Sequence, residues 1–323
     1  EKYVILKLNI KNKNLMIKVL KKNTKVIVFF LISIIILSVL HKINLLDFNS
    51  LLISIKKRPD LIILSIILYL ISIILGSLRY KLILSKFKHT LNYNNSLKIT
   101  ASSIFYGQWF PGSSALIELF RIFFLKQHIK INLKRSITVA IYDKAIGFLS
   151  MIIISIICFS IKFNINEKFG YYFFIIIIIG ILIVHCAQLI IFKIFKVSFN
   201  QKYSIFFSYE MLISLMISLC IVIIYYALSK VTNSDINLLD IAMMIPLIAI
   251  VAILPLGIGN LGGMQVGTLL IFQFVSEKNS EIVSMSIIFA IITIIVNTIL
   301  GSIFFKSTLG IFKKTIARYE TKK

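Results

Sequence analysis

The sequence predicts an all-α polytopic membrane protein with about six spanning helices, two opposed re-entrant helical hairpins and an inverted-topology repeat. The 323-residue chain is 59% hydrophobic, with a mean hydropathy of +0.96. Apolar runs long enough for a hydrocarbon core of ~30 Å recur along the chain. Two further apolar segments are interrupted by Pro and Gly, one at Pro111 and one at residues 255–263. A soluble enzyme with a single anchor is therefore excluded.

The formal charge of +24 indicates a membrane environment here and no nucleic-acid partner. The Lys and Arg residues lie mainly in short segments between apolar runs, where they orient helices and contact anionic lipid headgroups. The lysines that precede the first apolar run predict a cytoplasmic N-terminus. The number of predicted crossings then places the C-terminus in the cytoplasm as well. We expect a multi-pass protein of a bacterial or archaeal cytoplasmic membrane. The cysteines lie singly in apolar segments, so the sequence indicates no metal site and no disulfide.

The first half contains a broken segment between spanning helices. Residues 1–25 form a basic cytoplasmic segment, and no cleavage pattern follows the first apolar run, so we expect that run to be retained. The limbs on either side of Pro111 hold about 13 and about 15 residues and reach about 20 Å each, short of ~30 Å, which predicts a re-entrant hairpin. The spans predicted in this half are Val26–Leu40, Leu61–Leu78 and Ser136–Ile161.

The second half repeats this pattern in the opposite orientation. A segment broken at Pro255 reads as a second hairpin, entered from the outer side, and residues 306–323 form a basic cytoplasmic tail. We expect one transmembrane domain over residues 26–305, with half-repeats at about 26–163 and 171–305. Broken segments in corresponding positions indicate a substrate site. The spans predicted here are Tyr171–Phe192, Ile205–Leu228 and Ile282–Phe305.

Charged residues inside apolar segments are the first candidate site. Glu118 and Arg121 lie one helical turn apart, and Asp143 precedes Lys144 in a neighbouring segment. A charge at the centre of a span costs ~2.5–3.5 kcal/mol on insertion scales, so we expect these four side chains to meet as a neutral cluster. A cluster that only locks two segments together is an equally weighted alternative.

Several other polar residues are weaker candidates for substrate binding. The only Trp of the chain, Trp109, and Gln108 lie beside Pro111, and this setting favours substrate binding over a purely structural cluster. Arg79 ends the second predicted span, where snorkelling to the interface is a better explanation than phosphate contact. Two isolated ionisable residues are expected to be structural: His185 and Glu210.

The glycine-rich loop after the second Pro break is the other candidate site. Glycines allow unusual dihedrals and close approach to a ligand, and a helix that begins after the loop would offer its N-terminus to a phosphate. Close packing of helices through small residues is the alternative. The candidate residues of this loop are Pro255, Gly257, Gly259, Asn260, Gly262, Gly263 and Gln265.

Three motifs resemble the signatures of the lysylphosphatidylglycerol synthase transmembrane region, or flippase-like, family. They are Pro111 with Glu118-Leu119-Phe120-Arg121, then Asp143-Lys144-Ala145-Ile146-Gly147, then the run from Pro255 to Gln265. The chain departs from the family pattern at three places. Leu116-Ile117 stand where small glycines are often found, Lys144 replaces Arg, and Met264-Gln265 replace Arg-Glu.

The resemblance implies a membrane protein that moves an aminoacylated phospholipid or a glycolipid between leaflets, and from the basic residues we expect a headgroup that carries an anionic phosphate. This sequence shows no soluble aminoacyl-transferase domain and no nucleotide-binding motif, so we favour transport over enzymatic synthesis and expect no catalytic residue, cofactor or metal. The alternative is a membrane-embedded transferase or accessory subunit of envelope lipid or glycan assembly, with Glu118 or Asp143 as a base. A structural scaffold is a third hypothesis. Expected partners are membrane lipids, with a homo-oligomer or an envelope-biosynthesis protein as further options.

Overall fold

The computed structural model describes residues 31, 33–110, 113–129, 131–162, 208–252, 257–258 and 261–320. Several predictions concern residues outside these ranges, and the structure does not bear on them. They concern the start of the first span, the span Tyr171–Phe192, His185, Pro111, Pro255, Gly259 and Asn260.

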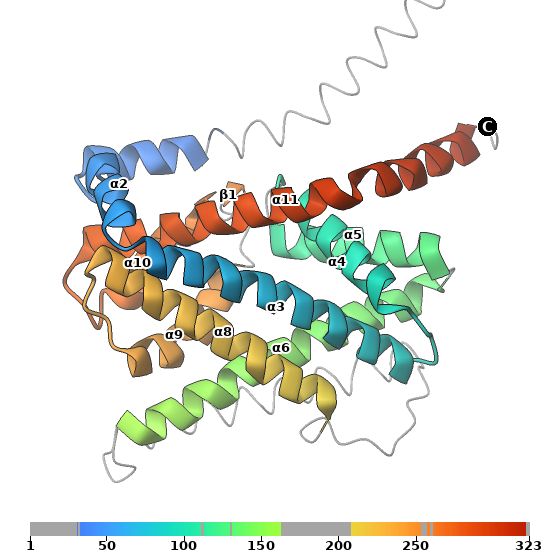
Figure 1. Ribbon diagram of the computed structural model, residues 1–323, viewed down its shortest axis with the longest axis horizontal. Coiled ribbons are helices and arrows are strands. Elements are labelled where there is room, and N and C mark those ends of the chain that lie inside the picture. Colours follow the sequence, from blue (N-terminus) through green and yellow to red (C-terminus); the bar gives the residue numbers. More distant parts are fainter. Residues whose placement is uncertain are drawn as a thin grey trace, which may run out of the picture.

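Four helices in the described part of the chain are long and apolar enough to cross a membrane. They make up most of the body of the molecule, in which two of them lie side by side and the other two run oblique to this pair (Figure 1). Their bounds are α3 Pro59–Lys86, α6 Leu133–Lys162, α8 Tyr209–Thr232 and α11 Asn279–Glu320. A shorter apolar helix, Ser33–Lys42, covers part of the first predicted span. These helices confirm an all-α polytopic membrane protein. Helix α11 also continues to Glu320, through most of the segment predicted as a tail.

Ion pairs show which helix ends lie together. Lys86, the last residue of α3, pairs with Glu210 in the first turn of α8 at 2.8 Å, so α3 and α8 are antiparallel. Helix α6 begins near the same end of α3 and finishes at Lys162, which pairs with Asp240 in the first turn of α9. We call these two ends of the molecule the Lys86 end and the Lys162 end.

Two pairs of shorter helices start from opposite ends of the molecule. Helices α4 (Tyr93–Gly107) and α5 (Ser113–Ile129) follow α3 at the Lys86 end, whereas α9 (Leu238–Val251) and α10 (Gly263–Phe272) lie between α8 and α11. At 1.5 Å per residue, α9 reaches about 21 Å and α10 about 15 Å, less than a hydrocarbon core of ~30 Å. Close packing of α4 on α5 depends on Gly107, where a Cβ atom would lie 2.5 Å from Ile117 Cγ1.

An amphipathic helix, α2 (Phe48–Lys57), lies between the first two apolar segments and is absent from the sequence-based prediction. The Asp47 side chain caps it by accepting hydrogen bonds from the backbone N–H groups of Asn49 and Ser50 at 2.9 and 3.3 Å. Its Leu51 is buried. A hydropathy pattern sought for spans of about 20 residues passes over such a short helix, although Asp before an amphipathic stretch is a helix-start signal.

The glycine-rich loop forms a short β-hairpin, where an irregular loop was expected. Strand β1 (Gly257–Ile258) pairs antiparallel with β2 (Leu261–Gly262), and α10 starts at the next residue. Gly262 has a φ of 96°, a left-handed value that favours glycine at this position.

Apolar surfaces on the long helices face outward, as lipid contact requires. Helix α3 carries a stripe of exposed isoleucines on one face, spaced by three or four residues: Ile63, Ile67, Ile71 and Ile74. Nearer the Lys86 end, buried aromatic and aliphatic side chains of α3, α5 and α6 form a separate core: Tyr80, Leu84, Phe124, Tyr142 and Ile146. Any charge within that core needs a partner, because desolvation of a lone charge is costly.

Candidate functional site

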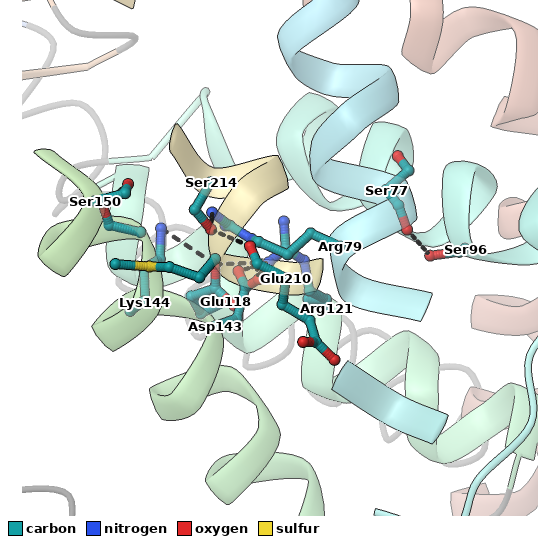
Figure 2. A network of polar contacts seen from close by, with 12 residues as sticks. Ser77, Arg79, Ser96, Glu118, Arg121, Asp143, Lys144, Ser150, Glu210 and Ser214 are labelled. Atoms are coloured by element: carbon teal, nitrogen blue, oxygen red, sulfur yellow. Dashed lines mark hydrogen bonds and ion pairs between the residues drawn. The ribbon is translucent and has the colours of Figure 1, made fainter. Parts of the chain in front are cut away.

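Helices α5 and α6 bring the four predicted charged residues together. Arg121 Nη1 donates to Glu118 Oε1 and Oε2 at 3.0 and 3.2 Å, and to Asp143 Oδ2 at 3.1 Å. Lys144 Nζ lies 3.2 Å from the same Glu118 Oε1. The first pair forms because residues one turn apart on a helix share a face. Figure 2 shows the side chains converging from separate ribbons, and the predicted meeting of these residues is confirmed.

Arg79 is a fifth member of this group. Its Nε donates to Asp143 Oδ1 at 2.8 Å, and its Nη1 donates to Ser214 Oγ on α8 at 3.0 Å. The snorkelling interpretation is therefore wrong. Helix α3 continues for seven residues beyond Arg79 to Lys86, which places Arg79 about 10 Å inside the helix end.

We call these five residues the charged cluster: Arg79, Glu118, Arg121, Asp143 and Lys144. Three cations face two carboxylates, so its formal charge is +1, where the prediction from four residues was zero. A surplus cation within the apolar part of a membrane protein is expensive unless an anion compensates it.

Gly147 makes room for Arg79. It lies one helical turn after Asp143 on α6, and a Cβ atom built on it would lie 3.3 Å from Arg79 Nη1. Such a contact is tighter than most real ones, so a larger side chain would press the guanidinium away from the Asp143 carboxylate. The glycine of the second sequence motif thus has a packing reason in this structure.

The cluster is most exposed at Lys144, and we call this its open side. The Lys144 side chain is 54% exposed and Glu118 is 12% exposed, whereas Asp143, which lies between the two arginines, is 3% exposed. Arg121 lies over the Tyr80 ring, 4.7 Å from its centroid. Its Nε is buried and makes no hydrogen bond within the described part of the chain. A ligand would meet Lys144 first, then Glu118.

A second buried ion pair lies beside the cluster on the α3–α8 interface. Glu210 pairs with Lys86, and its backbone carbonyl accepts from Ser214 Oγ at 2.7 Å, the same hydroxyl that Arg79 contacts. The prediction that Glu210 is isolated is wrong, because its partner is on a helix far away in the sequence. The hydrogen bond between Arg79 and Ser214 ties α8 to the cluster (Figure 2).

The polar residues at the tip of the α4–α5 hairpin face another helix. Gln108 is buried, and its Nε2 donates to Thr298 Oγ1 on α11 at 3.2 Å. Trp109 is 45% exposed. The described bond of Gln108 thus fixes the hairpin to α11, and the structure does not join either residue to the charged cluster by a described hydrogen bond.

Gln265 stabilises the glycine-rich hairpin itself. Its Oε1 accepts a hydrogen bond from the Gly262 N–H at 2.6 Å, and its Nε2 donates to Ser286 O at 3.5 Å. The side chain is fully buried, and neither bond reaches the charged cluster. The sequence predicted that N–H groups at the start of α10 bind a phosphate. One of them, the N–H of Gly262, already donates to Gln265. Gly267 supports the packing alternative, since a Cβ atom there would lie 2.1 Å from Val251 Cγ1 on α9.

Comparison with protein families matches residues 25–301 to the family described as lysylphosphatidylglycerol synthase TM region. The matched range contains the whole charged cluster and the glycine-rich hairpin. Neither the curated proteins nor the solved structures gave a significant match. The family match covers most of the chain and agrees with the apolar helices and their buried charges, and the protein therefore belongs to the lysylphosphatidylglycerol synthase transmembrane-region family.

Proposed function

We propose that this protein is a flippase-like carrier that binds a lipid with an anionic headgroup and moves it across the bilayer. The headgroup classes in question are phospholipid, aminoacyl-phospholipid and lipid-linked glycan. The family places the protein in lipid or envelope metabolism. One observation carries the proposal: the charged cluster has a surplus positive charge, and its most exposed member is the cation Lys144.

The depth of the cluster supports a lipid ligand. Asp143 is ten residues beyond the start of α6 and Arg79 is seven residues before the end of α3, so the cluster lies about 10–15 Å from the Lys86 end of these helices. Helices α3 and α6, with 28 and 30 residues, are about 42–45 Å long and extend beyond a hydrocarbon core of ~30 Å, so the cluster lies just inside the core, below the headgroups. A phosphate there would accept charge-assisted hydrogen bonds from Lys144 and replace the water that the cation lacks.

The arrangement of the hairpins supports a transport mechanism. The α4–α5 and α9–α10 hairpins begin at the Lys86 end and the Lys162 end respectively. We propose that they enter the membrane from opposite sides, as the re-entrant parts of an inverted repeat do in transporters. Basic residues at the Lys86 end favour a cytoplasmic location for it. They are Lys86, Lys88, Lys134 and Arg135.

The transferase alternative has less support from the site. Both candidate bases, Glu118 and Asp143, already accept hydrogen bonds from cations. Either carboxylate would have to give up these contacts before it could take a proton from a substrate hydroxyl. The distinction is testable, since only a transferase changes the mass of a lipid.

Reconstitution into vesicles tests the proposal. Fluorescent phospholipids and polyprenyl-phosphate lipids are placed in both leaflets, and quenching of the outer leaflet reports exchange. We expect the wild-type protein to accelerate exchange of at least one anionic class, with lipid masses unchanged. The double variant Glu118→Gln/Arg121→Gln keeps the formal charge of the cluster at +1 but removes the Arg121 guanidinium, so it should fold but lose this activity. No acceleration for any class would overturn the proposal, and full activity of the double variant would remove Glu118 and Arg121 from the mechanism.

A control variant separates charge in the site from charge elsewhere. Lys278 is 45% exposed and pairs with Asp235 at the other end of the molecule, so it resembles Lys144 in exposure and pairing but not in depth. Lys144→Gln should abolish acceleration, whereas Lys278→Gln should leave it unchanged.

A further inference from the structure

We infer that the Glu118 carboxylate is an internal competitor of the lipid headgroup, so that neutralising Glu118 tightens the binding of anionic lipids. This inference rests on the proposed function, because it assumes that the charged cluster binds an anionic headgroup. It assigns a role to Glu118 opposite to that of a residue that attracts substrate. An ordinary binding or structural residue would weaken binding when altered.

The two carboxylates of the cluster are not equivalent. Asp143 accepts from Arg79 and Arg121 and is 3% exposed, so it holds the inner arginines together. Glu118 lies on the open side and bridges Arg121 and Lys144 through one oxygen, Oε1, at 3.0 and 3.2 Å. Glu118 therefore occupies the place between two cations where a phosphate would bind.

Glu118 does not use all the hydrogen-bond donors of Arg121. Each described hydrogen bond of Arg121 uses Nη1, and its buried Nε has no partner among the described residues. A guanidinium can donate five hydrogen bonds in a fixed fork, which suits a phosphate better than a carboxylate that Arg121 contacts through Nη1 alone. Displacement of Glu118 would free Lys144 and part of Arg121 together.

Charge counting gives the direction of the effect. With Glu118 neutral, three cations face one carboxylate, and the formal charge of the cluster rises from +1 to +2. Asp143 continues to hold Arg79 and Arg121, so the inner part of the cluster keeps its ion pairs. The same change should slow release of the headgroup, because a bound lipid would no longer be displaced by the returning carboxylate. We expect binding to tighten and transport to slow.

The experiment measures binding directly in the purified full-length protein. Calorimetric titrations in detergent use dioctanoyl phosphatidylglycerol as the anionic probe, dioctanoyl phosphatidylcholine as the zwitterionic probe and inorganic phosphate as the free anion. Glu118→Gln should lower the Kd for phosphatidylglycerol on the order of tenfold, as a freed charge-assisted contact would. Lys144→Gln in the same background should cancel the gain. A gain confined to inorganic phosphate would contradict headgroup binding at this position.

The outcomes separate this inference from the proposed function. If neither the wild-type protein nor Glu118→Gln binds phosphatidylglycerol, the proposed function fails at this site. If the wild-type protein binds and Glu118→Gln binds equally or less tightly, only the competitor role is wrong. Glu118→Met provides a second neutral variant. If thermal unfolding shows that neither neutral variant folds, Glu118 is a structural partner of Arg121 and the inference is overturned.

Discussion

The two helical hairpins have the same sequence signal but different chemistry. Each is an apolar segment broken by Pro and Gly, and each was a candidate site. The α4–α5 hairpin carries Glu118 and Arg121, whose ion-pair partners Asp143 and Lys144 come from α6. In the α9–α10 segment, Asp240 in the first turn of α9 is the only charged residue of the sequence 238–272. There, Gln265 bonds to Gly262 within its own hairpin.

The difference shows that a broken helix alone does not identify a ligand site. Exposed backbone groups at a break can be satisfied by the chain itself, as Gln265 does for Gly262. Ionised side chains at membrane depth cannot be satisfied locally, so they draw in several elements and leave a net charge for a ligand. We therefore propose that the ligand binds at the first hairpin and that the second hairpin is structural.

The largest effect is expected when the shared carboxylate of the cluster is removed. Asp143→Ala leaves Arg79 and Arg121 buried without their common partner. Breaking a buried ion pair in this way costs about 3–5 kcal/mol. The free energy of unfolding in mixed micelles measures the loss, with Lys144→Ala, a change at the most exposed member, as the control. A loss below about 1 kcal/mol would show that the cluster is no more important for stability than a surface ion pair.

A smaller effect is expected from filling the space beside Arg79. Gly147→Val should push the guanidinium away from Asp143, and overpacking of this kind costs about 1–3 kcal/mol. Gly76→Val on α3 is a matched control, since a Cβ atom there meets nothing within 4 Å. Equal thermal stability of the two variants would contradict the packing role of Gly147.

The corresponding change in the second hairpin should affect stability alone. Gln265→Leu removes the acceptor of the buried Gly262 N–H, and an unsatisfied buried donor of this kind costs about 1–2 kcal/mol. Gln265→Glu keeps an acceptor at the same place and tests the hydrogen bond separately from side-chain volume. Phosphatidylglycerol binding, measured on folded protein, should be unchanged in Gln265→Leu. A loss of binding would return this hairpin to the ligand site.

The smallest effect is expected at an exposed pair outside the spanning helices. A hydrogen bond and the charge of Lys278 hold the pKa of Asp235 below its ordinary value. Asp235 is therefore charged at neutral pH, and any stability from the pair persists until the pH falls below about 4 and then through the lowered pKa. Asp235→Asn should leave the unfolding temperature unchanged at pH 7 and at pH 5. A clear decrease at either pH would show that charge matters equally at both ends of the molecule.

The sequence was sufficient to predict the cluster because its members obey local rules. Glu118 and Arg121 share a helix face, and Asp143 and Lys144 needed partners at depth. Arg79 was misjudged because basic residues interrupt the apolar run after Leu78, although the helix continues to Lys86 with Ile83 and Leu84 buried. The hydropathy pattern therefore ended the predicted span about two helical turns too early. As a result, Arg79 was left out of the predicted cluster, and its formal charge was predicted as zero.

Contacts between distant segments could not be predicted from periodicity. Lys86 and Glu210 pair across more than a hundred residues, and no local pattern connects them. The bond of Gln265 to Gly262 is local, but a glycine-rich loop at a helix start fits both a phosphate site and a self-capped turn. Only the position of the side-chain amide decides between them.

The most direct test of the central claim compares the two hairpins in one transport measurement. Exchange of a fluorescent anionic lipid between leaflets is measured for Lys144→Gln and Gln265→Leu, with rates normalised to the amount of folded protein in the vesicles. The account predicts that Lys144→Gln abolishes the acceleration and that Gln265→Leu retains it. Activity that survives Lys144→Gln and disappears with Gln265→Leu would contradict the assignment of the ligand to the charged cluster.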